Sequence, residues 1–198
     1  MPSLESANIR RSIVRDSVPN VSIQQERQDW EAHAATLALP DGITSREELL
    51  AGVRCLWVEQ EGRPLPAAAF FISGHFDMTL SGESLTTHCE VDPFTSRESL
   101  QRACDWYTSG ADRHLPLVSP AFAALHALPP LLLQVGSDEM LLSDSLRVAE
   151  RVRSHGGHVE LRVWDGMWHN WPMYVDLPEA DAAIAEAADF LGRFASRE

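Results

Sequence analysis

The sequence predicts a single α/β domain built around a mostly parallel sheet. From about Ala67 onward, apolar strand-like runs alternate with amphipathic helical segments, as they do when helices cover the faces of a parallel sheet. The chain has 198 residues, of which 44% are hydrophobic, and this is enough to bury one sizeable core. Both observations favour one α/β domain over two domains or a disordered chain.

The first predicted elements are a helix and a strand. Helical spacing of apolar residues predicts a helix over Ser22–Leu37, with Ser22 as its N-cap and Pro40–Gly42 as its stop. The apolar face of this helix consists of Ile23, Trp30, Ala34 and Leu37. The β-forming residues of Val53–Val58 then predict a strand.

A second strand follows closely. The continuous apolar run Ala67–Ser73 is typical of a strand that is covered on both faces. Only residues 59–66 separate it from Val53–Val58, and Gly62 lies near the middle of this connection. A connection this short suits a hairpin and is too short for a parallel crossover. The sequence therefore predicts that these two strands pair antiparallel.

Two more strands are expected in the second half of the chain. The apolar run Pro129–Val135 predicts a buried strand. The segment His158–Trp164 alternates apolar and polar residues, which indicates a strand with one wet face at the edge of the sheet.

Three amphipathic helices accompany these strands. They are expected over Ser96–Tyr107, over Ser143–Ser154 with Ser143 as N-cap, and over Glu179–Phe194. Gly156 and Gly157 end the second of them, so His155–Gly157 reads as a helix stop. The residues expected to face inward are Leu100, Cys104 and Tyr107 in the first helix, Leu146, Ala149 and Val152 in the second, and Ala180, Ala183, Ile184, Ala187, Leu191 and Phe194 in the third.

Charge and composition argue against several classes of partner. The formal net charge is -13, and a negative field of this size repels phosphate backbones and anionic membrane surfaces. No stretch of 18 apolar residues and no signal-peptide pattern occurs, so we expect no membrane span and a cytoplasmic protein. Cys55, Cys89 and Cys104 have no metal-ligand spacing and are expected to be reduced thiols.

Two loops carry the candidate chemistry. Residues 134–144 and residues 164–171 each follow the carboxyl end of a predicted strand, which is where open α/β sheets place their active sites. Asp138 lies in the first loop and His169 in the second. An acid beside a histidine fixes the imidazole tautomer and stabilises its protonated form. The sequence therefore predicts Asp138 and His169 as a catalytic pair.

Several stretches resemble the hormone-sensitive-lipase-like esterases, a branch of the α/β-hydrolase fold. The resemblance is carried by Leu128–Ser145 and Val163–His169, with support from Leu65–Ser84 and Leu117–Phe122. In the lead, Asn20–Ile23 and Leu39–Gly42 are similar to the family's cap-forming region. The resemblance implies a cap-like helical region over residues 1–40 and the sheet with its helices over residues 41–198.

The resemblance also implies an activity. It makes Asp138 the triad acid and His169 the triad base of a carboxylic-ester hydrolase that cleaves small acyl esters through an acyl-enzyme. No cofactor and no metal is expected for this chemistry. His155 and His158 have metal-like spacing, but no third ligand accompanies them.

The sequence departs from the family at the nucleophile. The family's serine lies in a G-x-S-x-G elbow, and an HGGG-type loop supplies oxyanion donors. No two glycines of this chain are four residues apart, so the elbow cannot be written, and His155–Gly157 reads as a helix stop and not as the oxyanion loop. Similarity stops at Glu59–Gln60 and resumes at Leu65, so roughly a hundred family residues with the elbow are expected to be missing near 61–64. The expected result is a truncated α/β-hydrolase fold with a mixed sheet of about five strands.

The departure leaves two readings of the function. The first is an esterase whose catalysis is impaired because the nucleophile is absent, with Ser73 and Ser137 as the nearest substitutes. The second is a non-catalytic binding or dimerisation module, or the product of an internally deleted gene. Loss of central strands exposes apolar faces, so dimerisation is expected.

Other residues near the predicted site have structural or pocket roles. Asp77, Glu83 and Ser84 match a family loop near the acyl pocket and are expected to be structural here. Five aromatic residues are expected to line the cap and pocket, or to form a dimer surface if exposed: Trp30, Phe76, Trp106, Trp168 and Trp171.

Overall fold

The computed structural model describes residues 2–13, 22–25, 28, 32, 41–50, 53–60 and 66–195. The chain divides into two compact units, one formed by Met1–Ser17 together with Ala67–Glu198 and the other by Val18–Pro66. The predicted loops at 134–144 and 164–171 both lie in the first unit. That all 198 residues form one domain stays a prediction.

The smaller unit contains an antiparallel strand pair. Strand β1 (Ile43–Leu50) pairs with β2 (Val53–Gln60) in a register that runs from Ile43 opposite Gln60 to Leu50 opposite Val53. The strand predicted at Val53–Val58 is thus confirmed. Its partner β1 was not predicted, because its sequence ITSREELL contains charged residues that are uncommon in strands.

The helix predicted over Ser22–Leu37 falls mostly outside the described residues. The hydroxyl of Ser22 accepts a hydrogen bond from the backbone N–H of Gln25 at 3.2 Å, as an N-cap does. Residues 23–25 are helical, whereas Trp30, Ala34 and Leu37 lie outside the described part of the chain.

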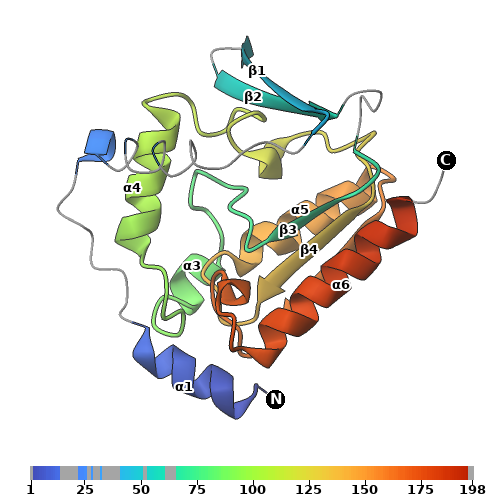
Figure 1. Cartoon of the computed structure of the whole chain (residues 1–198). Coiled ribbons are helices and arrows are strands. Elements are labelled where there is room, and N and C mark those ends of the chain that lie inside the picture. Colours follow the sequence, from blue (N-terminus) through green and yellow to red (C-terminus); the bar gives the residue numbers. More distant parts are fainter. Residues whose placement is uncertain are drawn as a thin grey trace. The chain divides into compact units, whose positions relative to one another are not determined.

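The larger unit contains a parallel sheet of three strands in the order β3-β4-β5 (Figure 1). These strands are β3 (Ala69–Ile72), β4 (Leu131–Gly136) and β5 (Val159–Trp164). All six residues of β4 are buried, and β5 forms one edge with a partly wet face, as predicted for both.

The predicted antiparallel pairing of Val53–Val58 with Ala67–Ser73 is wrong, and so is the single mixed sheet of about five strands. The five strands in the described ranges form one sheet of two and one sheet of three. Strand β2 has a nearer antiparallel partner in β1, from which only residues 51 and 52 separate it, and hairpins with two-residue connections are the commonest. Strand β3 instead pairs parallel with β4, from Ala69 opposite Leu131 to Ile72 opposite Gln134.

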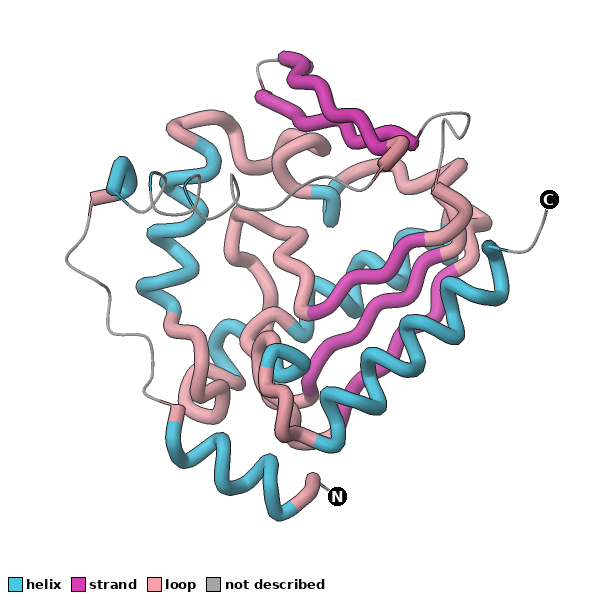
Figure 2. The backbone as a smooth tube through the Cα atoms, viewed as in Figure 1, coloured by secondary structure: helices cyan, strands magenta, loops and turns pink. Residues whose placement is uncertain are grey.

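Helices cover both faces of the parallel sheet, as Figure 2 shows. Successive side chains of a strand point to opposite faces. Leu131 and Leu133 of β4 accordingly pack in one apolar cluster with α5 (Leu142–Ser154), while Leu132 packs in another with Phe190 of α6 (Pro178–Ala195). This two-sided packing is why β4 is a continuous apolar run.

The helices of the larger unit agree with the predictions except at particular residues. Helix α4 (Arg97–Thr108) begins one residue after the predicted start, and Ser96 is its N-cap, with a side chain that forms a capping box with Ser99. Helix α5 begins at Leu142, and Ser143 is not its N-cap, because its hydroxyl accepts a hydrogen bond from the N–H of Ser84 in α3 (Ser84–Thr87). Three residues predicted to face inward are exposed instead: Tyr107, Leu146 and Ile184.

Helix α1 (Leu4–Ser12) belongs to the larger unit and was not predicted. Ser3 caps its N-terminus and is itself held by Glu179 at the start of α6. The Ser3 backbone N–H donates to Glu179 Oε1 at 2.6 Å and the Ser3 hydroxyl to Oε2 at 2.8 Å. Helix α1 is therefore anchored next to the first turn of α6.

Two short 3-10 helices complete the described elements, η1 (Pro120–Phe122) and η2 (Trp171–Met173). Within the described ranges, none of the helices combines the length and the apolar composition needed to cross a membrane.

Candidate active site

The two loops predicted to carry the chemistry lie side by side. Strands β4 and β5 are parallel neighbours, so the loops that follow them leave the same edge of the sheet. Two backbone hydrogen bonds join these loops: Ser137 N–H to Trp164 O at 2.9 Å and Asp138 N–H to Met167 O at 3.0 Å. Ser137 and Asp138 belong to the loop after β4, Trp164 is the last residue of β5, and Met167 lies in the loop after β5.

Gly136 at the end of β4 makes this close approach possible. A Cβ atom at residue 136 would lie 2.1 Å from the carbonyl oxygen of Met167. Such a contact would push the two loops apart, so glycine is required here for steric reasons.

His169 pairs with Glu139 in this structure. The Nδ1 atom of His169 lies 3.5 Å from Oε2 of Glu139, whose side chain is fully buried. Both atoms are buried, and neither has a hydrogen-bond partner among the described residues. The distance is long for a hydrogen bond, so the contact is a close approach of two polar atoms and not a formed hydrogen bond.

The other oxygen of Glu139 is held firmly. Oε1 accepts hydrogen bonds from the hydroxyl of Ser73 at 2.6 Å and from the backbone N–H of Gly136 at 2.7 Å. These two donors compensate part of the cost of burying a carboxylate. They also orient the group so that Oε2 is directed toward the imidazole.

The other ring nitrogen of His169 faces an amide. Nε2 lies 2.9 Å from Nδ2 of Asn170, an amide that donates when Nε2 is unprotonated. A proton on Nδ1 shared with Glu139 and a lone pair on Nε2 satisfy both contacts at once. The side chain of His169 remains 15% exposed, so the imidazole lies at the surface end of the network.

The predicted contact of Asp138 with His169 is wrong by one residue. The carboxylate of Asp138 forms an ion pair with Arg10 of α1, at 2.5 Å between Nη1 and Oδ2. The reason is local: the side chain of Asp138 stays 28% exposed beside Arg10, whereas that of Glu139 is fully buried. The sequence has two adjacent acids here, Asp138 and Glu139, and either could have been the partner of His169. Neither the spacing nor the family resemblance shows which of the two contacts the histidine.

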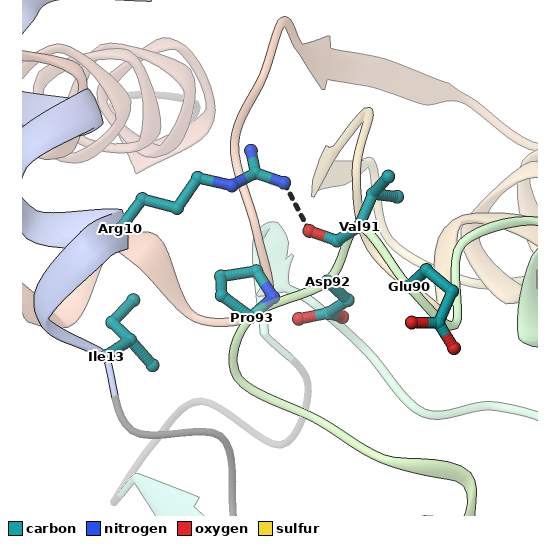
Figure 3. Close-up of a pocket in the computed structure, with 6 residues that line it drawn as sticks. All are labelled: Arg10, Ile13, Glu90, Val91, Asp92 and Pro93. Atoms are coloured by element: carbon teal, nitrogen blue, oxygen red, sulfur yellow. Dashed lines mark hydrogen bonds between the residues drawn. The ribbon is translucent and has the colours of Figure 1, made fainter.

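Arg10 connects three segments of the larger unit. Besides Asp138, its guanidinium donates to the carbonyl oxygens of Gly166, at 3.2 Å, and Val91. The Val91 contact is drawn in Figure 3, beside a pocket of about 350 Å³. This pocket is lined by Arg10, Ile13, Glu90, Val91, Asp92 and Pro93, and its lining includes neither His169 nor Glu139.

Both serines considered as substitute nucleophiles have other partners. The hydroxyl of Ser73 donates to Glu139 and accepts from the N–H of Asn170 at 2.9 Å. The hydroxyl of Ser137 donates to Oδ1 of Asp138 at 3.0 Å and accepts from the N–H of Gly166 at 2.8 Å. Each hydroxyl therefore has its proton directed at a carboxylate and not at His169.

Comparisons with known proteins bear on this arrangement. The profile of a family described as alpha/beta hydrolase fold matches residues 49–173, which is more than half of the chain. The chain belongs to the α/β-hydrolase fold family.

Named relatives of this α/β-hydrolase include an esterase and an acetyl-hydrolase. An esterase of Acinetobacter venetianus is 34% identical over 163 residues, which are 77% of this chain and 54% of the relative. An acetyl-hydrolase of Streptomyces hygroscopicus is 40% identical over 131 residues, covering 66% and 44% of the two chains. The chain thus spans about half the length of the curated relatives it matches.

Solved structures that resemble this chain include members of the hormone-sensitive lipase family. A hormone-sensitive lipase from a metagenome library is 37% identical, with a TM-score of 0.64 and coverage of 68% of this chain and 46% of that one. An esterase from the bacterial hormone-sensitive lipase family shows the same fold, with a TM-score of 0.74 at 22% identity over 98% of this chain and 99% of that one.

Two titratable residues of the loop after β3, His75 and Asp77, have shifted pKa values. Burial lowers the pKa of His75, and the nearby His169 contributes in the same direction. Burial alone would raise the pKa of Asp77, but hydrogen bonds from Ser81 and Thr79 outweigh it and hold that pKa below its usual value. Arg147 also binds Asp77, at 2.5 Å.

The contacts of Asp77 and Ser84 are structural, as expected. Asp77 is saturated by the partners just named. The hydroxyl of Ser84 donates to the carbonyl oxygen of Met140, while its N–H donates to Ser143. These bonds fasten the loop after β3 to the start of α5 and leave no acyl-pocket contact to assign to the two residues.

The aromatic residues named from the sequence are distributed over the core and the surface. Trp168 and Trp171 are fully buried in a core cluster with Leu177 of the loop before α6, and Phe76 is buried near β4. Trp106 is half-buried, with Arg102 over its ring, and Trp30 lies outside the described residues. Trp168, Trp171 and Phe76 are therefore core residues and form no exposed patch.

The two histidines with metal-like spacing have separate partners. His155 Nδ1 lies 2.7 Å from the carbonyl oxygen of Arg151, and His158 Nε2 lies 3.5 Å from Glu160. Within the described part of the chain, no three or more His, Cys, Asp or Glu side chains are grouped so that they could hold a metal.

Proposed function

We propose that this chain carries the acid–base half of a carboxylic-ester hydrolase, with His169 as general base and Glu139 as the acid that orients it. The observation that carries the proposal is the 3.5 Å approach of two buried, otherwise unpartnered atoms, His169 Nδ1 and Glu139 Oε2. Acid and base lie on adjacent loops at the carboxyl edge of the sheet, where α/β folds place their sites. The family's esterase relatives support small acyl esters as the substrate class.

The geometry suits proton transfer at Nε2. Glu139 keeps the Nδ1 proton in place, so the Nε2 lone pair is available to take a proton from a serine hydroxyl or a water. The imidazolium that forms is stabilised by the buried carboxylate and then returns the proton to the leaving alcohol. The amide of Asn170 occupies the Nε2 position at rest and has to move aside for this transfer.

We further propose that turnover is impaired. A G-x-S-x-G elbow cannot be written anywhere in the sequence, and the hydroxyls of Ser73 and Ser137 are directed at carboxylates. An HGGG-type oxyanion loop is also missing from the sequence, so the donors that give residual catalysis when a triad member is removed are not supplied. The same absences favour the second candidate function, a non-catalytic binding or dimerisation module.

Hydrolysis of a short-chain p-nitrophenyl ester and labelling with a serine-directed fluorophosphonate test the proposal. The proteins compared are the wild type, His169→Ala, Glu139→Gln and Asp138→Asn. We expect no label and the same hydrolysis rate for all four, because no serine is poised at Nε2. Wild-type turnover that is lost in His169→Ala and Glu139→Gln but kept in Asp138→Asn would support the acid–base assignment and refute the impairment. Loss in Asp138→Asn alone would refute the assignment of Glu139.

A further inference from the structure

We infer that Ser73 is a positioning residue for the Glu139–His169 pair, an inference that rests on the proposed function. Ser73 follows β3, the strand that neither the acid nor the base is attached to. Its side chain is buried, with the residue only 4% exposed. Its hydroxyl contacts the acid directly and the loop that carries the base. It binds the carboxylate of Glu139 and the backbone N–H of Asn170, the residue after His169.

The direction of the Ser73 hydroxyl follows from its two contacts. The N–H of Asn170 is a donor, so the oxygen of Ser73 has to accept there, at 2.9 Å. The hydroxyl proton is then free to point at Oε1 of Glu139, 2.6 Å away. A charge-assisted hydrogen bond of this kind is stronger than one between neutral groups. Ser73 therefore fixes the carboxylate rotation that turns Oε2 toward His169.

The backbone of Ser73 and Asn170 is strained. Ser73 has φ +52° and Asn170 has φ +57°, both in the left-handed region that residues other than glycine rarely adopt. Such conformations cost free energy and persist only where surrounding contacts enforce them. Five described residues other than glycine have positive φ, and two of them, Ser73 and Asn170, hydrogen-bond to each other. Each of these two also contacts one member of the acid–base pair.

The chain supplies a matched control in Ser137. The hydroxyl of Ser137 also donates to a carboxylate and accepts a backbone N–H from the loop after β5. Its carboxylate, however, is that of Asp138, which pairs with Arg10 and not with His169. Removing either hydroxyl breaks the same kinds of hydrogen bond, but only Ser73 should affect the imidazole.

The test is the Nδ1–H proton resonance of His169, recorded by NMR on the intact chain and assigned by its loss in His169→Ala. We expect Glu139→Gln and Ser73→Ala each to move this resonance upfield or broaden it away, and Ser137→Ala to leave it unchanged. Ser73→Gly serves as a second variant, because glycine adopts the same backbone conformation without strain. Circular dichroism of each variant checks that it is folded.

The outcomes separate the two proposals. A resonance that is unchanged in Ser73→Ala and Ser73→Gly but lost in Glu139→Gln overturns the role of Ser73 and leaves the acid–base pair standing. A resonance that persists in Glu139→Gln, or that is absent from the folded wild type, overturns the pair itself and with it the proposed function. Equal losses in Ser73→Ala and Ser137→Ala show a general structural effect and overturn the positioning role.

Discussion

Replacing Asp144 with asparagine should change how the stability of the protein depends on pH. Asp144 lies in α5 and is 1% exposed, and its Oδ2 accepts the backbone N–H groups of Phe76 and Asp77 at 2.8 Å each. Burial raises the pKa of Asp144 from 3.8 to about 6, the charge of Asp77 adds to the rise, and the two hydrogen bonds and Arg147 oppose it. A rise of this size corresponds to roughly 3 kcal/mol of differential interaction.

The sign follows from proton binding. The folded protein binds the Asp144 proton more tightly than the unfolded chain, so ionisation of this group destabilises the fold. Its contribution to the free energy of unfolding is highest below the unfolded pKa of 3.8 and is lost as pH rises to about 6. Asparagine retains one acceptor oxygen for both N–H groups and cannot ionise. The free energy of unfolding of Asp144→Asn minus that of the wild type should therefore rise by roughly 3 kcal/mol from about pH 4 to about pH 7.

Urea unfolding followed by tryptophan fluorescence at several pH values in this range measures the difference. Asp77→Asn is the matched control, because hydrogen bonds hold the pKa of Asp77 below its usual value against the effect of burial. Its stabilising contribution is present above the unfolded pKa of 3.8 and is lost only as pH falls below that value, so its difference curve should be flat from about pH 4 to about pH 7. Parallel pH profiles for the wild type and Asp144→Asn would refute the reasoning.

Three further predictions concern packing and reactivity. Gly136→Ala should lower the free energy of unfolding by about 3 kcal/mol or more, since the added Cβ would meet the Met167 carbonyl at 2.1 Å; a loss below about 1 kcal/mol in urea unfolding would contradict this contact. Phe190→Ala, at a fully buried position, should cost about 3 to 5 kcal/mol, whereas Phe70→Ala, at a position 39% exposed, should cost clearly less; equal costs would contradict the burial pattern. In a Cys55→Ser background, Cys89 should react with Ellman's reagent while Cys104 stays protected until unfolding, because Cys104 is buried and burial raises its pKa to about 11; fast modification of both thiols would argue against it.

Strands β4 and β5 of the parallel sheet could be predicted because their signals are local and strong. The run Leu131–Val135 is apolar at every position except Gln134, and it is buried throughout because α5 and α6 cover opposite faces. The alternation in Val159–Trp164 likewise reports an edge strand. The residue pattern of each of these two strands indicates whether one or both of its faces are buried, so no other part of the sequence is needed to predict it.

Strand pairing and side-chain direction could not be predicted in the same way. Whether Val53–Val58 pairs with Ala67–Ser73 depends on which other strands are available. Strand β1 pairs with β2 instead, because the connection between these two strands is shorter. The candidate acid shows the same limit at finer scale, since the pattern locates the loop after β4 but not which of Asp138 and Glu139 turns inward. Arg10 decides part of this by pairing with Asp138, and no local pattern links residues so far apart in sequence.

The sheet order explains why the acid, and not the base, is the most buried member of the network. Glu139 follows the central strand β4, whereas Ser73 and His169 follow the flanking strands β3 and β5. Neighbouring strands lie about 4.8 Å apart, so side chains at their ends reach the central carboxylate from both sides. A fully buried carboxylate without such partners would be strongly destabilising.

Ser73 and His169, the partners of the Glu139 carboxylate, are thus required for folding whether or not the chain hydrolyses an ester. Removing Ser73 or His169 would leave part of the Glu139 carboxylate buried and uncompensated, at a cost that a marginally stable fold does not tolerate well. Stability alone therefore suffices to retain the acid–base pair. For this reason the fluorophosphonate label and the His169-dependent rate, and not the presence of Glu139 and His169, distinguish a working hydrolase from a non-catalytic module.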